Sequence, residues 1–299
     1  MLSLIDPLER RQLLAAVSFV GTAGDDRVVF STISATTLRL TIGAKLHVID
    51  PRKIDLINLQ LLAGHDRVTF MNAPPSTLRL KLDGGDGNDT LYGSRGNDTI
   101  LGGGGNDFIS DGPGNDSVDA GGGDDHLFSG AGNDTLIGGS GNDVLNTEAG
   151  NAGFKDSLLG GTGHDTITVA YGSATLSGQS GNDTLTAGSA SATLQGGDGD
   201  DSLVGGSGHD LLTGGFGVDT LKGNAGNDTL WGGEDTDHLS GGSGKDEFHA
   251  GSGDDYIRAI DLTFNELVDG GSGKDLAYID RDKLTGKPRD YLMSIEKLV

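Results

Sequence analysis

The chain has 299 residues, of which 54 are glycine, 5% are aromatic and none is cysteine, and its formal net charge is −23. A wide, close-packed core is excluded by so few large apolar residues, and disulfides are excluded by the lack of cysteine. The acidity argues against binding to nucleic acid or to an anionic membrane surface, and no apolar run is long enough to span a membrane.

Residues 1–20 allow two interpretations, a targeting segment or a cap. Two arginines precede a short apolar stretch, Leu13 to Val20, but Asp6 and Glu9 are misplaced for a secretion signal. Residues 8–14 resemble a Leu-Glu-Pro-Arg-x-Leu-Leu motif found at the start of some large bacterial surface proteins, with Arg10 in place of the proline. A short capping helix is the alternative.

Residues 21–83 contain a longer repeat, whose two copies are offset by forty positions. The stretch from Ala23 to Phe30 matches that from Ala63 to Phe70, and residues 37–40 match residues 77–80. Alternating apolar residues predict strands. We expect a metal-poor start of a β-solenoid that covers the open edge of the first coil. Asp26 and Asp66 stand where a metal ligand would, but without a double glycine before them.

A nine-residue unit begins at Gly84 and is repeated without a gap as far as Asn146. We divide the rest of the chain by this period. A first repeat block covers residues 84–146, an insertion residues 147–155, and a second block residues 156–258. Residues 259–299 hold a last repeat and a C-terminal cap.

Each position of the unit has a physical role. Glycines at the first, second and fourth positions permit tight turns, through positive φ or a close approach of backbones. Asn or Asp at the fifth position also tolerates left-handed geometry. The apolar eighth residue points inward from a short strand, because side chains alternate across a strand. Two nonapeptides then form one coil of turn, strand, turn and strand, which predicts an all-β parallel β-roll or β-solenoid.

A carboxylate occupies the sixth position of nearly every unit, and this repetition indicates a metal ligand rather than a hydrolase acid/base pair. Without these eighteen acids the formal net charge of −23 would fall to −5, so cations bound by them would neutralise most of the excess charge. The predicted ligands are Asp89, Asp98, Asp107, Asp116, Asp125, Asp134, Asp143, Asp156, Asp165, Asp183, Asp201, Asp210, Asp219, Asp228, Asp237, Asp246, Asp255 and Asp275.

These units resemble the RTX family, whose haemolysin-type nonapeptide is Gly-Gly-x-Gly-x-Asp-x-(apolar)-x, over roughly residues 84–278. The resemblance implies a β-roll in which each Ca²⁺ lies between turns one coil apart, held by sixth-position carboxylates and loop backbone carbonyls. Such oxygen-only ligands suit Ca²⁺ better than Mg²⁺, which prefers a strict octahedron and keeps its waters. The glycines expected to contribute are Gly85, Gly87, Gly103, Gly105, Gly197, Gly199, Gly206 and Gly208.

Two units of the second block lack the sixth-position acid and have Ala174 and Ala192 instead, although Leu176 and Leu194 keep the apolar eighth position. Because the two alanines are separated by two nonapeptides, one full coil, we expect them on the same edge, which then carries a metal-free gap of two turns. Pairs of sixth-position acids one coil apart within each block give 12 candidate sites, so the expected cofactor is on the order of a dozen Ca²⁺.

Catalysis by this chain is not expected. RTX arrays often follow a catalytic domain, but only about 83 residues precede this array, and neither a His-Glu-x-x-His nor a Gly-x-Ser-x-Gly motif occurs. No two of the seven histidines have helical zinc-ligand spacing, and exposure explains His164 and His209 at the fifth position. Ranks of threonine that would suit ice binding are broken by other residues.

The function expected from this resemblance is that of a calcium-binding protein, secreted or at the surface of a bacterium, which folds on Ca²⁺ binding. Its role would be structural or adhesive, with cell-surface or matrix polysaccharide as a partner. The tail is expected to cap the last coil, and a C-terminal signal for type I secretion is the alternative. A different function is also open, a carrier or secretion module of an extracellular protease, lipase or polysaccharide epimerase whose catalytic part is elsewhere.

Overall fold

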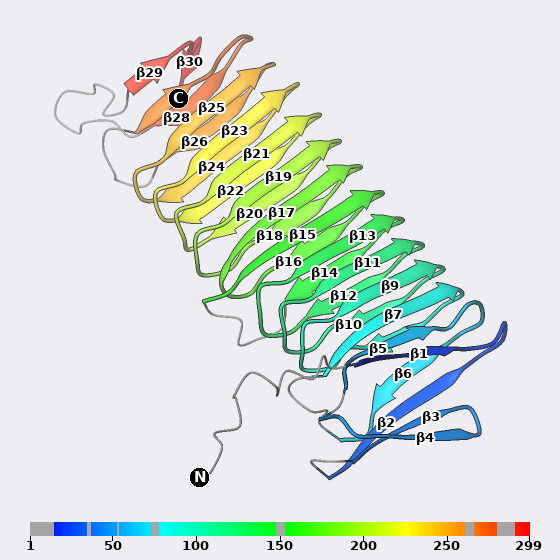
Figure 1. Cartoon of the computed structure of the whole chain (residues 1–299). Coiled ribbons are helices and arrows are strands. Elements are labelled where there is room, and N and C mark those ends of the chain that lie inside the picture. Colours follow the sequence, from blue (N-terminus) through cyan, green and yellow to red (C-terminus); the bar gives the residue numbers. More distant parts are fainter. Residues whose placement is uncertain are drawn as a thin grey trace, which may run out of the picture.

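The structure is a computed structural model that describes residues 15–34, 37–52, 54–72, 78–147, 153–260, 266–279 and 291–299. Every regular element within these ranges is a β-strand, which confirms the predicted all-β class. The strands stack into an elongated solenoid (Figure 1). The motif at residues 8–14 lies outside the described residues. Residues 15–20 form a strand, and the rest of the segment expected to target or cap the chain lies outside the described residues.

Two sheets form the two faces of the solenoid, and their strands are parallel except for β2 (Arg27–Ser34), β3 (Thr37–Ile42) and β4 (Lys45–Ile49) at the N-terminal end. The described residues of the first form a 14-stranded sheet with the order β1 (Ala15–Val20), β5 (Ile54–Gln60), β7 (Arg79–Asp86), β9 (Thr99–Gly104), β11 (Ser117–Gly122), β13 (Thr135–Ser140), β15 (Lys155–Thr162), β17 (Ser173–Ser180), β19 (Thr193–Asp198), β21 (Leu211–Phe216), β23 (Thr229–Glu234), β25 (Glu247–Ser252), β27 (Leu267–Asp269) and β29 (Tyr291–Met293).

The described residues of the second form a 16-stranded sheet with the order β30 (Lys297–Leu298), β28 (Leu276–Ile279), β26 (Tyr256–Ala259), β24 (His238–Ser243), β22 (Thr220–Ala225), β20 (Ser202–Gly206), β18 (Thr184–Thr186), β16 (Thr166–Thr168), β14 (Val144–Thr147), β12 (His126–Ser129), β10 (Phe108–Ser110), β8 (Thr90–Tyr92), β6 (Arg67–Phe70), β2 (Arg27–Ser34), β3 (Thr37–Ile42) and β4 (Lys45–Ile49). Successive strands of the chain alternate between the sheets along the repeat blocks, so the backbone winds as a coil.

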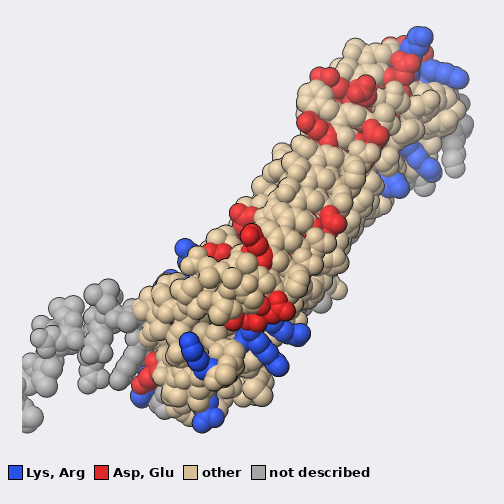
Figure 2. All heavy atoms as spheres, turned by 90° about the vertical axis from the view of Figure 1, so that its right-hand side faces the viewer, with Lys and Arg blue, Asp and Glu red and all other residues tan. Residues whose placement is uncertain are grey.

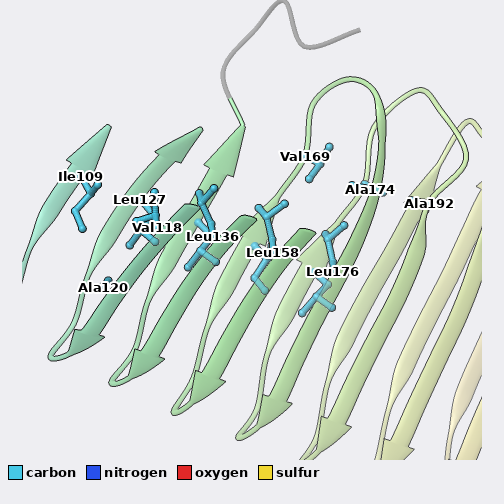
Figure 3. Packing of buried hydrophobic residues seen from close by; sticks show 14 of the residues in the cluster. Ile109, Val118, Ala120, Leu127, Leu136, Leu158, Val169, Ala174, Leu176 and Ala192 are labelled. Atoms are coloured by element: carbon cyan, nitrogen blue, oxygen red, sulfur yellow. The ribbon is translucent and has the colours of Figure 1, made fainter. Parts of the chain in front are cut away.

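The register confirms two nonapeptides per coil. Ile109 pairs with Leu91 on one side and with Leu127 on the other, each two repeat units away. These eighth-position residues are fully buried. They face a second buried row from the other sheet, of which Figure 3 shows Val118, Leu136, Leu158 and Leu176. Because each fully buried leucine contributes about 1.5–3 kcal/mol, this narrow ladder stabilises the strands.

The two phase slips leave the stacking of the coils intact. Leu136 pairs with Leu158, so this coil is longer than two nonapeptides, and its extra four residues lie between β14 and β15, where residues 148–152 are outside the described part. At the second slip Ile257 pairs with Ala277, so that coil is longer by two positions. The insertion therefore lengthens a loop and does not shift the strands.

At the N-terminal end, β2 and β6 of the two copies of the longer repeat pair in parallel, with Val28 beside Val68, and β1 pairs in parallel with β5, with Ser18 beside Asn58. The second part of this predicted repeat has no such equivalence. Residues 37–40 belong to β3, which is antiparallel to β2 in the 16-stranded sheet, whereas Leu80 lies in β7 of the other sheet. A turn at Gly43, with φ of 55°, joins β3 to β4 and keeps this segment in an antiparallel meander.

At the C-terminal end, β29 pairs with β27 and β30 pairs with β28, so the described tail residues add a further coil to both sheets. This position agrees with a tail that covers the last coil. Among the described residues, no helix is long and apolar enough to cross a membrane.

Candidate metal-binding edges

The sixth-position acids lie on two edges of the solenoid, in the loops that join the sheets. We call the loops that lead from the 14-stranded to the 16-stranded sheet the continuous edge, and the loops that lead back the interrupted edge. The continuous edge carries Asp26, Asp66, Asp89, Asp107, Asp125, Asp143, Asp165, Asp183, Asp201, Asp219, Asp237, Asp255, Asp275 and Glu296. The interrupted edge carries Asp98, Asp116, Asp134, Asp156, Ala174, Ala192, Asp210, Asp228, Asp246 and Glu266.

Hydrogen bonds connect these acids along each edge. The backbone N–H of Asp89 donates to Oδ1 of Asp107 at 2.7 Å, and the N–H of Asp107 donates to Oδ1 of Asp125 at 2.7 Å. On the continuous edge the same bond links every successive pair from Asp26 to Glu296. One carboxylate oxygen per residue is therefore fixed by the neighbouring coil.

The second oxygen of most of these carboxylates has no hydrogen-bond partner although it is buried. This is the Oδ2 atom of Asp66, Asp89, Asp107, Asp116, Asp125, Asp134, Asp143, Asp165, Asp183, Asp201, Asp210, Asp219, Asp228, Asp237, Asp255 and Asp275. Burying a polar atom without a partner is costly, and a charged one more so. Because these unsatisfied oxygens recur from coil to coil, they indicate a row of cation sites along each edge.

The first-position glycine lies against this second oxygen and leaves space beside it. A Cβ atom on Gly84 would overlap Asp89 Oδ2 and come within 2.5 Å of the carbonyl oxygen of Gly102, one coil on. On Gly196 it would overlap Asp201 Oδ2 and lie 2.8 Å from the Gly214 carbonyl oxygen. A carboxylate from one loop and a carbonyl from the next thus converge on the same space. Hard oxygen donors at this spacing fit Ca²⁺, so the residues fit the implied ion.

The second and fourth glycines shape the loop. Gly85 and Gly87 have φ of 99° and 132°, and a Cβ on either would overlap the carbonyl oxygen of Leu62 or Gly64 in the preceding coil. Positive φ and close approach therefore both require glycine. The predicted glycines Gly103, Gly105, Gly197, Gly199 and Gly206 share this positive φ; Gly208 does not, and close approach of the Ala190–Ser191 backbone accounts for it.

Burial makes the carboxylates hard to ionise when no cation is bound. It raises the pKa of Asp107 and Asp183 to about 7 and that of Asp116 to about 8. The hydrogen bond from the preceding acid's N–H opposes this rise in pKa, and the negative charges of neighbouring acids add to it. At neutral pH the ladder therefore favours either protons or a cation over free carboxylates.

The fifth-position residues form another ladder, which the sequence interpretation missed. Oδ1 of Asn88 accepts from the N–H of Asn106 at 2.9 Å, and Nδ1 of His164 accepts from the N–H of Asn182 at 2.8 Å. The left-handed geometry that Asn or Asp would tolerate at the fifth position is not adopted there. The positive φ values of the repeat loops fall at second and fourth positions, and the fifth side chain is instead a hydrogen-bond acceptor. Exposure alone therefore does not explain His164 or His209, whose Nδ1 also accepts.

The structure places both alanines on the same edge, as expected. Ala174 pairs with Asp156, and the acid ladder resumes where the N–H of Ala192 donates to Oδ1 of Asp210 at 2.8 Å. Leu176 still pairs with Leu194, so the strands continue past the gap. Ala174 and Ala192 line a groove of about 620 Å³ along these coils, and Figure 3 labels both beside the loops of their strands.

All 12 acid pairs that the spacing predicts occur as hydrogen-bonded neighbours. Seven further pairs join them, at the N-terminal end, across the slips and at the C-terminal end: Asp26/Asp66, Asp66/Asp89, Asp134/Asp156, Asp143/Asp165, Asp246/Glu266, Asp255/Asp275 and Asp275/Glu296. The sequence prediction missed Glu266 and Glu296 because they are not Asp, and because they lie 20 and 21 residues after Asp246 and Asp275 instead of the 18 of a regular coil.

Comparison with protein families agrees with this geometry. The model of the RTX calcium-binding nonapeptide repeat matches residues 83–118, 101–136, 119–151, 152–185, 170–191, 186–221, 213–248 and 222–257. A comparison with curated proteins gave no match. The matches together span residues 83–257, more than half of the chain, and cover most of both edges. The chain belongs to the family of RTX calcium-binding nonapeptide repeat proteins.

Proposed function

We propose that this protein is secreted or displayed on a bacterial surface, and that Ca²⁺ switches it from a disordered chain to a rigid solenoid with a structural or adhesive role. The observation that carries the proposal is the row of buried carboxylates whose second oxygens have no partner. When bound, Ca²⁺ supplies the positive charge that these oxygens need. The free energy of binding then becomes free energy of folding.

The chain's own groups prepare the edges for this switch. The backbone N–H of each acid holds Oδ1 of the acid one coil on, which leaves Oδ2 directed at the space beside the first-position glycine. Without a cation, ranks of acids one coil apart repel one another. Cytosolic Ca²⁺ is too scarce to fill sites of the affinity typical of extracellular modules, about 10⁻⁴–10⁻³ M. Folding would then follow export.

The outer surface supports a structural role rather than a catalytic one. Because the ladder acids are buried, few charged side chains are visible along the middle of the face in Figure 2, and lysines and arginines gather towards the two ends. A long, regular surface of this kind suits a spacer or an adhesive module. The proposed role therefore includes no reaction of its own.

Polysaccharide is the proposed partner of this surface. Trp231 is 46% exposed on the 14-stranded sheet and stacks on His249 with ring centroids 3.9 Å apart. Thr213 and Asp269 line the same groove, of about 510 Å³. An exposed ring beside polar groups suits a sugar, whose ring has an apolar face and hydroxyl edges. Trp231→Ala should reduce retention on immobilised bacterial polysaccharide at saturating Ca²⁺, and equal retention of both proteins would contradict this part.

Far-UV circular dichroism of the metal-free chain, titrated with CaCl₂ and with MgCl₂ as control, tests the folding switch. We expect a cooperative gain of β signal between micromolar and millimolar Ca²⁺ and none with Mg²⁺. A chain that is fully folded in excess chelator at pH 8.5, where the acids are ionised, and does not change with Ca²⁺ would overturn the proposal. The apolar ladder and the terminal coils would then be sufficient for folding.

A further inference from the structure

One loop of the interrupted edge contains an additional buried acid. Asp111 follows β10 and occupies the first position of its repeat unit, where Gly93 stands one coil earlier. Its side chain is fully buried. No role has been assigned to it so far, because the RTX pattern has glycine at this position.

The contacts of Asp111 leave one oxygen unsatisfied. Its Oδ1 accepts a hydrogen bond from the N–H of Gly130 at 2.7 Å, while its buried Oδ2 has no hydrogen-bond partner. The Oδ2 atoms of Asp116 and Asp134 are unsatisfied as well. Carboxylate oxygens of Asp111, Asp116 and Asp134 lie within 4.8 Å of one another, and among the described residues this is the one group of three such ligands.

The neighbourhood of these three acids is negative and rich in oxygen. Burial raises the pKa of Asp111 well above its usual range, and the charges of Asp134 and Asp116 raise it further. Ser129, the first-position residue one coil on, is also fully buried and its hydroxyl has no partner. A loop with glycine at the first position has no side-chain oxygen there, so it brings fewer oxygens to the site than the Asp111 loop does.

Elsewhere on the edges, the space beside the first position is bounded by one carboxylate from its own loop and the next coil's carbonyl. Asp111 brings a third carboxylate to the pair Asp116/Asp134. Ligand charge is one of the two properties that set the affinity of a Ca²⁺ site, and the rigidity imposed by burial is the other.

We propose that Asp111, Asp116 and Asp134 form a three-carboxylate Ca²⁺ site that binds more tightly than the two-carboxylate sites and fills first. This inference rests on the proposed calcium-dependent folding. The site lies in the first repeat block on the edge that later loses its acids. Because Asp111 and Asp116 share one loop and Asp134 lies one coil on, filling this site first would join two consecutive coils before the weaker sites are occupied.

Isothermal titration calorimetry of the full chain with CaCl₂ tests this site, using Asp111→Asn and the control Asp119→Asn. Asparagine keeps an acceptor for the Gly130 N–H but removes the charge, and Asp119 is an exposed acid of the same repeat unit. For the wild type and Asp119→Asn we expect one binding step about tenfold or more tighter than the rest. This step should be absent in Asp111→Asn.

The outcomes separate this inference from the proposed function. Circular dichroism at saturating Ca²⁺ checks that each variant folds. If Asp111→Asn does not fold, Asp111→Gly, which restores the glycine of the repeat pattern, takes its place. If the wild type binds Ca²⁺ and folds, but Asp111→Asn and Asp111→Gly have the same binding steps as Asp119→Asn, then the proposal of a three-carboxylate site is wrong. The folding switch stands in that case. If the wild type shows no Ca²⁺-dependent step, the folding switch itself is wrong.

Discussion

The two edges of the solenoid have the same strands behind them but different acids. On the continuous edge an acid follows an acid from Asp26 to Glu296, whereas on the interrupted edge two coils have alanine. The strands beside Ala174 and Ala192 keep their pairing and their buried leucines. The apolar ladder therefore determines where the strands lie, and the acids determine whether a loop can hold a cation. Structure and metal binding are separable coil by coil.

The largest expected effect is that of pH on the metal-free chain, because it acts on both edges at once. The buried acids have raised pKa values, about 7 for Asp107 and about 8 for Asp116, so the folded state binds more protons than the unfolded state. Stability is then highest below the unfolded pKa of about 4 and is lost as pH rises through about 6–8. Circular dichroism in chelator should show β structure at pH 5 that disappears by pH 8.5.

Saturating Ca²⁺ is the control for this pH dependence, since it favours the charged carboxylates and should keep the fold at pH 8.5. A metal-free chain that became more stable between pH 5 and pH 8.5 would show that the acids are not protonated in the folded state.

A smaller loss of stability is expected when one acid of the continuous edge is replaced by alanine, the residue that interrupts the other edge. Asp183→Ala removes the carboxylate shared by the Asp165 and Asp201 pairs. The backbone N–H of Asp165 would lose its buried acceptor, so unfolding in Ca²⁺ should become easier by at least about 2 kcal/mol. Urea titration would measure this, with the exposed acid in Asp198→Asn as control. An unchanged unfolding midpoint would mean that the Asp183 pairs hold no cation.

The smallest effect is expected from repairing the interrupted edge. Ala174→Asp with Ala192→Asp would restore an acid to each of the two coils between Asp156 and Asp210. Val169 and Ala187, at the first positions of these units, take part of the space that glycine leaves free, so the new sites should be weak. We expect a slightly higher thermal midpoint in millimolar Ca²⁺ and a lower one in chelator. Lower midpoints in both conditions would show that the gap is not a pair of missing sites.

The sequence predicted the repeated part of the molecule well because one period controls it. A nine-residue interval between Leu91 and Ile100 is enough to predict the strand, its inward face and the coil. The parts that sequence reasoning missed depend on contacts between coils. The hydrogen bond from Asn106 to Asn88 joins residues of successive coils, and the polarity of Asn gives no sign of it.

In the N-terminal segment, the likeness of residues 37–40 to residues 77–80 does not extend to the fold. The direction of a strand is determined by the turn before it and the sheet it joins. β3 turns back beside β2, whereas β7 continues the coil. Glu266 shows the same limit for ligands, since it lies 20 residues after its hydrogen-bond partner Asp246 and not at the spacing of a regular coil.

The four extra residues between β14 and β15 have a consequence for the use of this fold as a scaffold. Although they lengthen the coil that contains them, the backbone N–H of Asp134 still donates to Asp156 and that of Asp143 to Asp165, as in the regular coils. A corner of the coil can therefore carry an added peptide without disturbing its neighbours. A foreign epitope grafted at this corner would project from a rod that, under the proposed switch, folds when Ca²⁺ is added.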